Sequence, residues 1–275
     1  MPIPLKTDAS ALPRIAASSY LNSAPLIWSF VRGSRRMGIE LIDAVPALCA
    51  DLLAQSRVAA ALIPVIEYQR ISNLTVVPEV CVASREKVRS VVLATRASEL
   101  KDVHSVALDE SSRTSAALIK IIFREFIGIE PKWTSCVPDL QRMLSENDGA
   151  LIIGDPGMTI SHEGFRIWDM ASLWREHTAL GFVFAMWMIR DDAFAAVRRV
   201  DFRAACEEGL AETEGIIDFY EPLLGWQRHE LHLYLTENIT FFMDAELRAG
   251  LDLFYKLAKR HGLIPTVKPL KSFEP

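Results

Sequence analysis

SYLNSAP, residues 19–25, connects a short strand-like run at residues 14–18 to an apolar, helix-like run at residues 24–30. This pattern predicts a strand-to-helix loop, and open α/β sheets bind their ligands at such loops. Pro25 suits the first turn of a helix, and Ser23 or Asn22 can cap that turn. The heptapeptide alone leaves two interpretations open: a helix cap, or one wall of a ligand site.

The alternation of strands and helices continues beyond this loop. We expect a strand at residues 39–43, a helix at 46–55 and an apolar strand at 58–63, typical of a strand buried on both faces of a parallel sheet. A second series follows, with strands at 105–108, 132–136 and 150–153 and helices at 115–126 and 138–145. Because the alternation of strands and helices begins again, the sequence predicts an α/β fold with a second lobe.

The lobes are expected to be joined by two crossings. Residues 75–83 and 90–94 read as strands, and the polar patch between them is read most simply as a solvated hairpin loop. An apolar strand at 182–189 leads back to the first lobe, and residues 190–261 are helical in pattern. We therefore predict a first lobe of residues 1–95 and 190–275, a second lobe of residues 96–189, and a ligand cleft that excludes water when it closes.

Composition excludes several classes of protein. The formal net charge of -5 argues against non-specific nucleic-acid binding, so an anionic ligand must be held by local donors. The first twenty residues do not read as a secretory signal, and no apolar run approaches the roughly 20 residues that span a bilayer. We expect a cytoplasmic protein without membrane contacts. The four cysteines lie far apart, as expected of reduced, mostly buried thiols.

Cofactor and metal motifs are missing from the sequence. It has no glycine-rich dinucleotide loop, no phosphate-binding lysine motif and no serine nucleophile elbow. His229 and His232 are three residues apart, which misses the spacing that places two zinc ligands on one helix face. We expect neither a cofactor nor a metal.

Two further stretches offer polar groups where cleft residues should emerge. ESSRTS, residues 110–115, starts a predicted helix, where free amides, hydroxyls and the helix dipole can hold a carboxylate or phosphate, although plain capping is the alternative. GDPG, residues 154–157, follows an apolar strand. Asp155 is either a base or hydrogen-bond acceptor for a ligand, or part of an ordinary turn.

With these segments in order, the chain resembles the chorismate dehydratase family of the futalosine route to menaquinone. The likeness runs from about residue 14 to residue 264 and rests on the order of short matches: SYLNSAP (19–25), AALI (60–63), IEY (66–68), RSVVL (89–93), TSAAL (114–118), LIIGD (151–155), FVFAMW (182–187), YLTENI (234–239) and GLDLFY (250–255). Three positions depart from the family pattern: Ser23 stands where threonine is common, Pro64 where serine is common, and Gly181 where proline is common.

The resemblance implies a two-lobed fold like that of type II periplasmic binding proteins, with a C-terminal helical segment. It also implies a hydro-lyase that removes water from chorismate, a dicarboxylate, to give 3-[(1-carboxyvinyl)oxy]benzoate without a cofactor. Whether the chain is a monomer or a homodimer stays open. Two rivals share the fold: a non-catalytic module that binds a small anion, and the sister enzyme that releases 1,4-dihydroxy-6-naphthoate.

On this resemblance we assign roles to ten residues. Thr114 and Ser115, with nearby amides, would hold one carboxylate of chorismate, and Ser90 with Arg89 the other. Asn22 would orient the departing hydroxyl or the ether region. Asp155 is the candidate base, and the substrate's own enolpyruvyl carboxylate is the alternative proton acceptor. The remaining expected substrate contacts are Tyr20, Ser23, Gly154 and Phe184.

Overall fold

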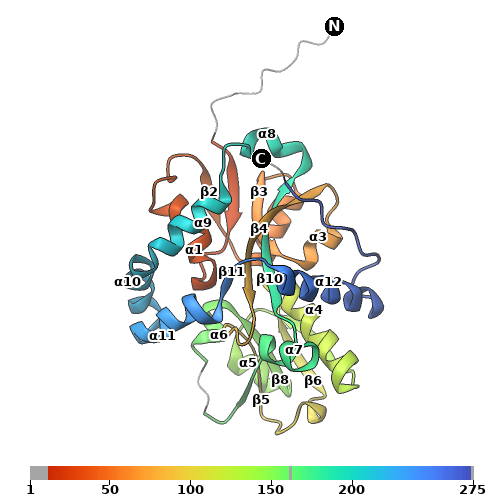
Figure 1. Cartoon of the computed structure of the whole chain (residues 1–275). Helices are drawn as coiled ribbons and strands as arrows, with labels where there is room; N and C mark the ends of the chain where they lie inside the picture. Colours follow the sequence, from red (N-terminus) through yellow and green to blue (C-terminus); the bar gives the residue numbers. More distant parts are fainter. Residues whose placement is uncertain (1–11, 161–162, 274–275) are drawn as a thin grey trace.

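Two β-sheets with helices packed around them organise the chain in the computed structural model, which describes residues 12–160 and 163–273 (Figure 1). The expectations for the N-terminal segment concern residues 1–11 in part, and those residues lie outside the described ranges. The mixed α/β architecture is the predicted one. In Figure 1 the two sheets lie one beyond the other along the length of the molecule.

The first sheet has six strands in the order β11-β4-β10-β3-β1-β2. β1 pairs in parallel with β2 and β3, whereas β10 runs antiparallel to both β3 and β4. Every residue of β3 is buried, as its apolar sequence predicts. The strands are β1 (Arg14–Ala17), β2 (Glu40–Asp43), β3 (Ala60–Pro64), β4 (Leu74–Ser84), β10 (Phe182–Arg190) and β11 (Thr240–Phe242), and the helices between the first four are α1 (Ala24–Val31), α2 (Pro46–Ala54) and α3 (Ile66–Arg70).

The second sheet has five strands in the order β7-β6-β8-β5-β9. Its strands are β5 (Val91–Thr95), β6 (Ser105–Asp109), β7 (Lys132–Cys136), β8 (Gly149–Ile153) and β9 (Arg166–Asp169). Its helices are α4 (Arg113–Ile121), which continues as the π-helix η3 (Ile122–Ile127), α5 (Leu140–Glu146), α6 (Gly154–Met158) and α7 (Met170–Thr178). The sequence pattern missed β9 and α7.

Both predicted lobe boundaries were wrong by one strand. β5, which was assigned to the first lobe, pairs with β8 and β9 in the second sheet, and β10, which was assigned to the second lobe, lies in the first sheet. The chain therefore crosses at residues 85–90 and 179–181, and the hairpin interpretation of residues 84–89 is also wrong. The physical reason is that β5 and β10 are apolar on both faces, so their sequences do not indicate which sheet they join.

The C-terminal helices cover the first sheet and reach the second. The predicted helical stretch is interrupted by β11, and it contains η4 (Asp191–Ala193), α8 (Phe194–Val197), α9 (Phe202–Ala211), α10 (Thr213–Leu224), α11 (Arg228–Leu233), η5 (Tyr234–Asn238) and α12 (Ala245–Arg260). α9 packs on α1, while α12 contacts β10 and also α4 (Figure 1). One buried apolar cluster consequently includes residues from both sheets.

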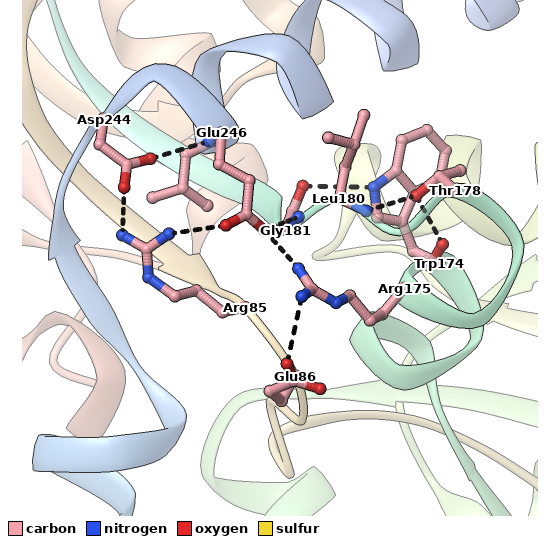
Figure 2. A network of polar contacts seen from close by, with 10 residues as sticks. Arg85, Glu86, Trp174, Arg175, Thr178, Leu180, Gly181, Asp244 and Glu246 are labelled. Atoms are coloured by element: carbon pink, nitrogen blue, oxygen red, sulfur yellow. Dashed lines mark hydrogen bonds and ion pairs between the residues drawn. The ribbon is translucent and has the colours of Figure 1, made fainter.

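A network of polar contacts joins the two crossings to the start of α12 (Figure 2). Arg85, in the first crossing, binds Asp244 at 2.7 Å and Glu246 at 3.3 Å. Gly181, in the second crossing, donates its amide to Glu246 at 3.1 Å. Arg175, near the end of α7, also pairs with Glu246. Glu246 therefore connects both crossings, which set the relative position of the sheets.

Glu246→Ala is expected to lower the free energy of unfolding by about 1–2 kcal/mol, because it removes two ion pairs and a backbone hydrogen bond that are about one-third exposed. Urea denaturation measures this change. The matched control is Glu176→Ala, which removes an exposed carboxylate from α7. Equal losses in the two variants would mean that the network does not brace the crossings.

Candidate functional site

A cavity of about 50 Å³ lies where the two sheets face each other. Seven of the ten expected site residues line it: Tyr20, Asn22, Ser23, Thr114, Ser115, Gly154 and Phe184. The other lining residues are Ser18, Pro46, Leu62, Pro64, Val82, Val91, Ser112, Ile153 and Ala185. Loops that are far apart in the sequence thus meet at one cavity, as their positions after strands predicted.

The described wall of the cavity combines apolar side chains with uncharged polar ones. Among the residues of the described ranges that line it, the polar side chains are hydroxyls and one carboxamide, and none is Asp, Glu, Lys, Arg or His. An anionic ligand at this site must therefore be held by neutral donors, by backbone amides and by helix dipoles.

The first turn of α4 supplies one group of donors. Ser112 precedes the helix without capping it through its side chain, and the carbonyl of Ser112 accepts the first helical hydrogen bond from Ala116. The amides of residues 113–115 therefore have no acceptor within the helix. The Thr114 hydroxyl accepts a hydrogen bond from the amide of Ile66 at 3.2 Å. Thr114 and Ser115 both line the cavity. A helix start with unpaired amides and neighbouring hydroxyls can bind a carboxylate.

The loop after β1 supplies the opposite wall. It forms the short helix η1 (Leu21–Ser23), which leads directly into α1. The Ser23 hydroxyl donates to the side-chain oxygen of Asn22 at 3.1 Å. Because this contact satisfies the amide oxygen of Asn22, its NH₂ group is the part free to donate to a ligand.

Tyr20 and Gly154 are in direct contact, and both line the cavity. Gly154 has a φ of +67°, and a Cβ atom there would lie 2.6 Å from two carbons of the Tyr20 ring. Only glycine fits both the backbone conformation and this close approach. Burial, followed by the nearby charges of Asp109 and Asp155, raises the pKa of Tyr20, so its hydroxyl stays protonated at neutral pH.

Asp155 lies next to this cavity but not in its wall. Its Oδ1 accepts a hydrogen bond from the amide of Leu21 at 2.9 Å. The carboxylate thus connects α6, at the end of β8, with the loop after β1. Burial raises the pKa of Asp155 to about 6, although the Leu21 hydrogen bond opposes this shift. Asp155 thus holds the loop that carries Asn22, and it is not among the described residues that line the cavity, where the sequence predicted a base.

Arg89 and Ser90 point away from the cavity, contrary to expectation. The Arg89 guanidinium pairs with Glu230 at 2.5 Å and stacks 4.3 Å from the centre of the Trp226 ring. Ser90 is fully buried, and its hydroxyl accepts a hydrogen bond from Tyr234 at 2.7 Å. The turn at Arg89, with a φ of +60°, directs these side chains toward α11 and η5.

Sequence reasoning missed Ser18 and Ser112 as cavity residues. Ser112 lies within the hydroxyl-rich stretch that was singled out, so its position at the helix start was the available signal. Ser18 follows β1 at its carboxyl end, which is also a position that favours ligand contact. Pro64 lines the cavity, which places this departure from the family pattern at the site itself.

A family model and a characterised relative both match this chain over most of its length. Residues 13–260 match a family model described as menaquinone biosynthesis. The chain is 30% identical over 254 residues to a chorismate dehydratase of Thermus thermophilus, and the alignment covers 86% of this chain and 91% of that protein.

Solved structures support the fold. A protein of Archaeoglobus fulgidus is similar at a TM-score of 0.74 and 17% identity, covering 93% of this chain and 100% of that one. The aliphatic sulphonate binding protein of Escherichia coli is similar at a TM-score of 0.61 and 17% identity, covering 96% and 94%. A Candida albicans protein with the generic periplasmic binding protein fold is similar at a TM-score of 0.64 and 12% identity, covering 94% and 92%. The chain therefore has the two-lobed fold of periplasmic binding proteins.

Proposed function

We infer that this chain, which belongs to the menaquinone biosynthesis family, is a chorismate dehydratase, a hydro-lyase that converts chorismate to 3-[(1-carboxyvinyl)oxy]benzoate. The observation that carries the inference is the 30% sequence identity to the Thermus thermophilus enzyme over 86% of this chain. A cavity whose described wall combines hydroxyls and one carboxamide with apolar side chains suits this reaction. The cytoplasm is the compartment we propose for it.

The reaction requires little catalytic assistance from the protein. The ring hydrogen of chorismate beside the enolpyruvyl ether is vinylogously acidic, because the charge left behind spreads through the ring alkene to the ring carboxylate. Departure of the hydroxyl then forms the aromatic ring. The protein must hold two carboxylates, stabilise the extended dienolate and assist the leaving hydroxyl.

We assign the first turn of α4 to one substrate carboxylate. The free amides of residues 113–115, the hydroxyls of Thr114 and Ser115 and the positive end of the helix dipole all favour a negative group there. Growing charge on the ring carboxylate in the transition state makes these donors more effective than in the ground state. Asn22, on the opposite wall, would donate its NH₂ group to the departing hydroxyl or to the ether region.

The proton acceptor that fits best is the enolpyruvyl carboxylate of chorismate itself. No carboxylate or imidazole lies among the described residues of the cavity wall. Asp155, the protein's candidate, is bound to the Leu21 amide. An intramolecular carboxylate is already close to the ring hydrogen, and such proximity replaces a protein base effectively.

Asp155→Asn is therefore expected to keep a kcat within about threefold of the wild-type value, since an asparagine oxygen can still accept the Leu21 hydrogen bond. Steady-state kinetics with chorismate measures this. A loss of about 100-fold or more, the range expected for removal of a general base, would restore Asp155 as the base.

For the same variant we predict how the free energy of unfolding depends on pH. The folded-state pKa of Asp155 is raised from 3.8 to about 6, so the folded protein holds this proton more tightly than the unfolded chain. Ionised Asp155 thus costs stability, and the cost is absent below about pH 4 and grows to about 2–3 kcal/mol as the pH rises through 6. Asp155→Asn should be more stable than wild type at pH 7.5 and equal to it at pH 4. Urea denaturation across this range tests it, with Asp102→Asn, which replaces an exposed carboxylate, as the control.

The test of the proposed function is a comparison of substrates. Purified protein is incubated separately with chorismate and with the cyclic futalosine derivative used by the sister enzyme. We expect loss of water from chorismate and no reaction of the other compound, because the relative that this chain matches over 86% of its length is a chorismate dehydratase. Thermal stabilisation by chorismate without turnover would instead favour the binding-module alternative.

A further inference from the structure

Arg113 joins α4 to two helices that belong to the other sheet. Its Nη2 lies 2.8 Å from both carboxylate oxygens of Asp51 on α2, and its Nη1 lies 3.0 Å from Oε2 of Glu67 on α3. The Glu67 side chain is only 5% exposed. The guanidinium therefore crosses the boundary between the sheets and pairs with two separate elements.

Two hydrogen bonds donated by backbone amides cross at the same place. The amide of Ala47 on α2 donates to the carbonyl of Ser111 at 3.2 Å, and the amide of Ile66 on α3 donates to the Thr114 hydroxyl at 3.2 Å. Arg113 itself is absent from the described cavity wall, whereas its neighbours Ser112, Thr114 and Ser115 form part of it. Arg113 thus lies beside the cavity, between two residues that line it.

We propose that Arg113 is a positioning residue for the dehydration reaction: by pairing with Asp51 and Glu67 it holds the cleft closed and fixes the first turn of α4 against the substrate. The inference rests on the proposed function for its effect on turnover. Closure brings the donors of α4 and Asn22 to one ligand, so a weaker closed state leaves fewer molecules competent for the reaction.

An arginine is needed for this geometry. Its planar guanidinium presents separate N–H groups to Asp51 and Glu67 at once, while a lysine ammonium is a single point charge that reaches one of them well. Glu67 also pairs with Arg70 at 2.8 Å, but Arg70 belongs to α3 itself. Arg70 thus forms an ion pair with the same carboxylate without crossing between the sheets, which makes it the matched control.

The experiment compares Arg113→Gln with Arg70→Gln in the full chain. We expect kcat/KM for chorismate to fall about tenfold in Arg113→Gln and to stay within about twofold of wild type in Arg70→Gln, with Arg113→Lys between them. Should Arg113→Gln fail to fold, Asp51→Asn serves instead, because it removes one partner across the boundary and leaves both ion pairs of Glu67. The Arg113 and Asp51 changes should combine non-additively.

Small-angle X-ray scattering of the unliganded proteins separates this proposal from the proposed function. Arg113→Gln should have a larger radius of gyration than wild type and Arg70→Gln. A wild-type protein that does not dehydrate chorismate would refute the proposed function, while the scattering comparison would still decide the closure role. Equal kinetic and scattering changes in the Arg113 and Arg70 variants would overturn the proposal, since they would show only loss of partners for Glu67.

Discussion

Asn22→Ala is expected to lower kcat for chorismate by about 100-fold or more, which is the loss seen when one well-placed donor to developing charge is removed. Asn22 lines the cavity, and its oxygen is satisfied by the Ser23 hydroxyl, so its NH₂ group is the donor that the substitution deletes. The first turn of α4, on the other wall, is unchanged, so KM should change less than kcat. Steady-state kinetics on chorismate measures both parameters.

Ser23→Ala is the control for this variant. It removes the hydroxyl that holds the Asn22 oxygen but leaves the NH₂ group in the cavity, so we expect a loss of only about threefold to tenfold. Thermal unfolding should show that both variants are folded. Turnover of Asn22→Ala close to that of Ser23→Ala would remove Asn22 from the mechanism.

Gly154→Ala should damage stability and activity together. An alanine there must adopt a φ of +67°, and its Cβ would lie 2.6 Å from the Tyr20 ring. The backbone conformation costs about 1–2 kcal/mol and the overpacking about 1–3 kcal/mol, so we expect a loss of about 2–5 kcal/mol in the free energy of unfolding. Because Tyr20 lines the cavity, its displacement should also lower kcat/KM by at least tenfold.

Gly128→Ala isolates the backbone part of this effect. Gly128 has a φ of +81°, and nothing lies within 4 Å of the Cβ position, so only the conformational cost applies. Urea denaturation and kinetics of both variants give the comparison. If Gly154→Ala were no less stable than Gly128→Ala and fully active, the close contact between Tyr20 and Gly154 would not shape the cavity.

Local sequence patterns predicted most elements of the fold because their signals are local. The apolar run of β3 and the helical spacing of α12 each indicate one type of element. These local signals do not indicate which other strands or helices an element packs against. β5 and β10 are apolar on both faces, so the sequence left open which sheet each strand joins, and both lobe boundaries were misplaced. β11 has only three residues, too few for a periodic signal.

The candidate site shows the same contrast between local signals, which the sequence contains, and contacts between distant segments, which it does not indicate. Thr114, Ser115 and Asn22 were predicted because loops at the carboxyl ends of strands converge on a cleft, whatever the details of packing. Side-chain direction depends on backbone conformation that the pattern does not reveal. The positive φ of Arg89 turns its guanidinium toward Glu230. The Leu21 amide likewise engages Asp155, and no local signal indicated that contact between distant segments.

The measurement that tests the central claim most directly is the reaction of purified protein with chorismate in the absence of added metal and nucleotide, followed by product mass and ultraviolet absorbance. The account predicts a product lighter than chorismate by one water, with the absorbance of an aromatic ring. Chorismate that stays intact in the presence of folded protein would contradict it.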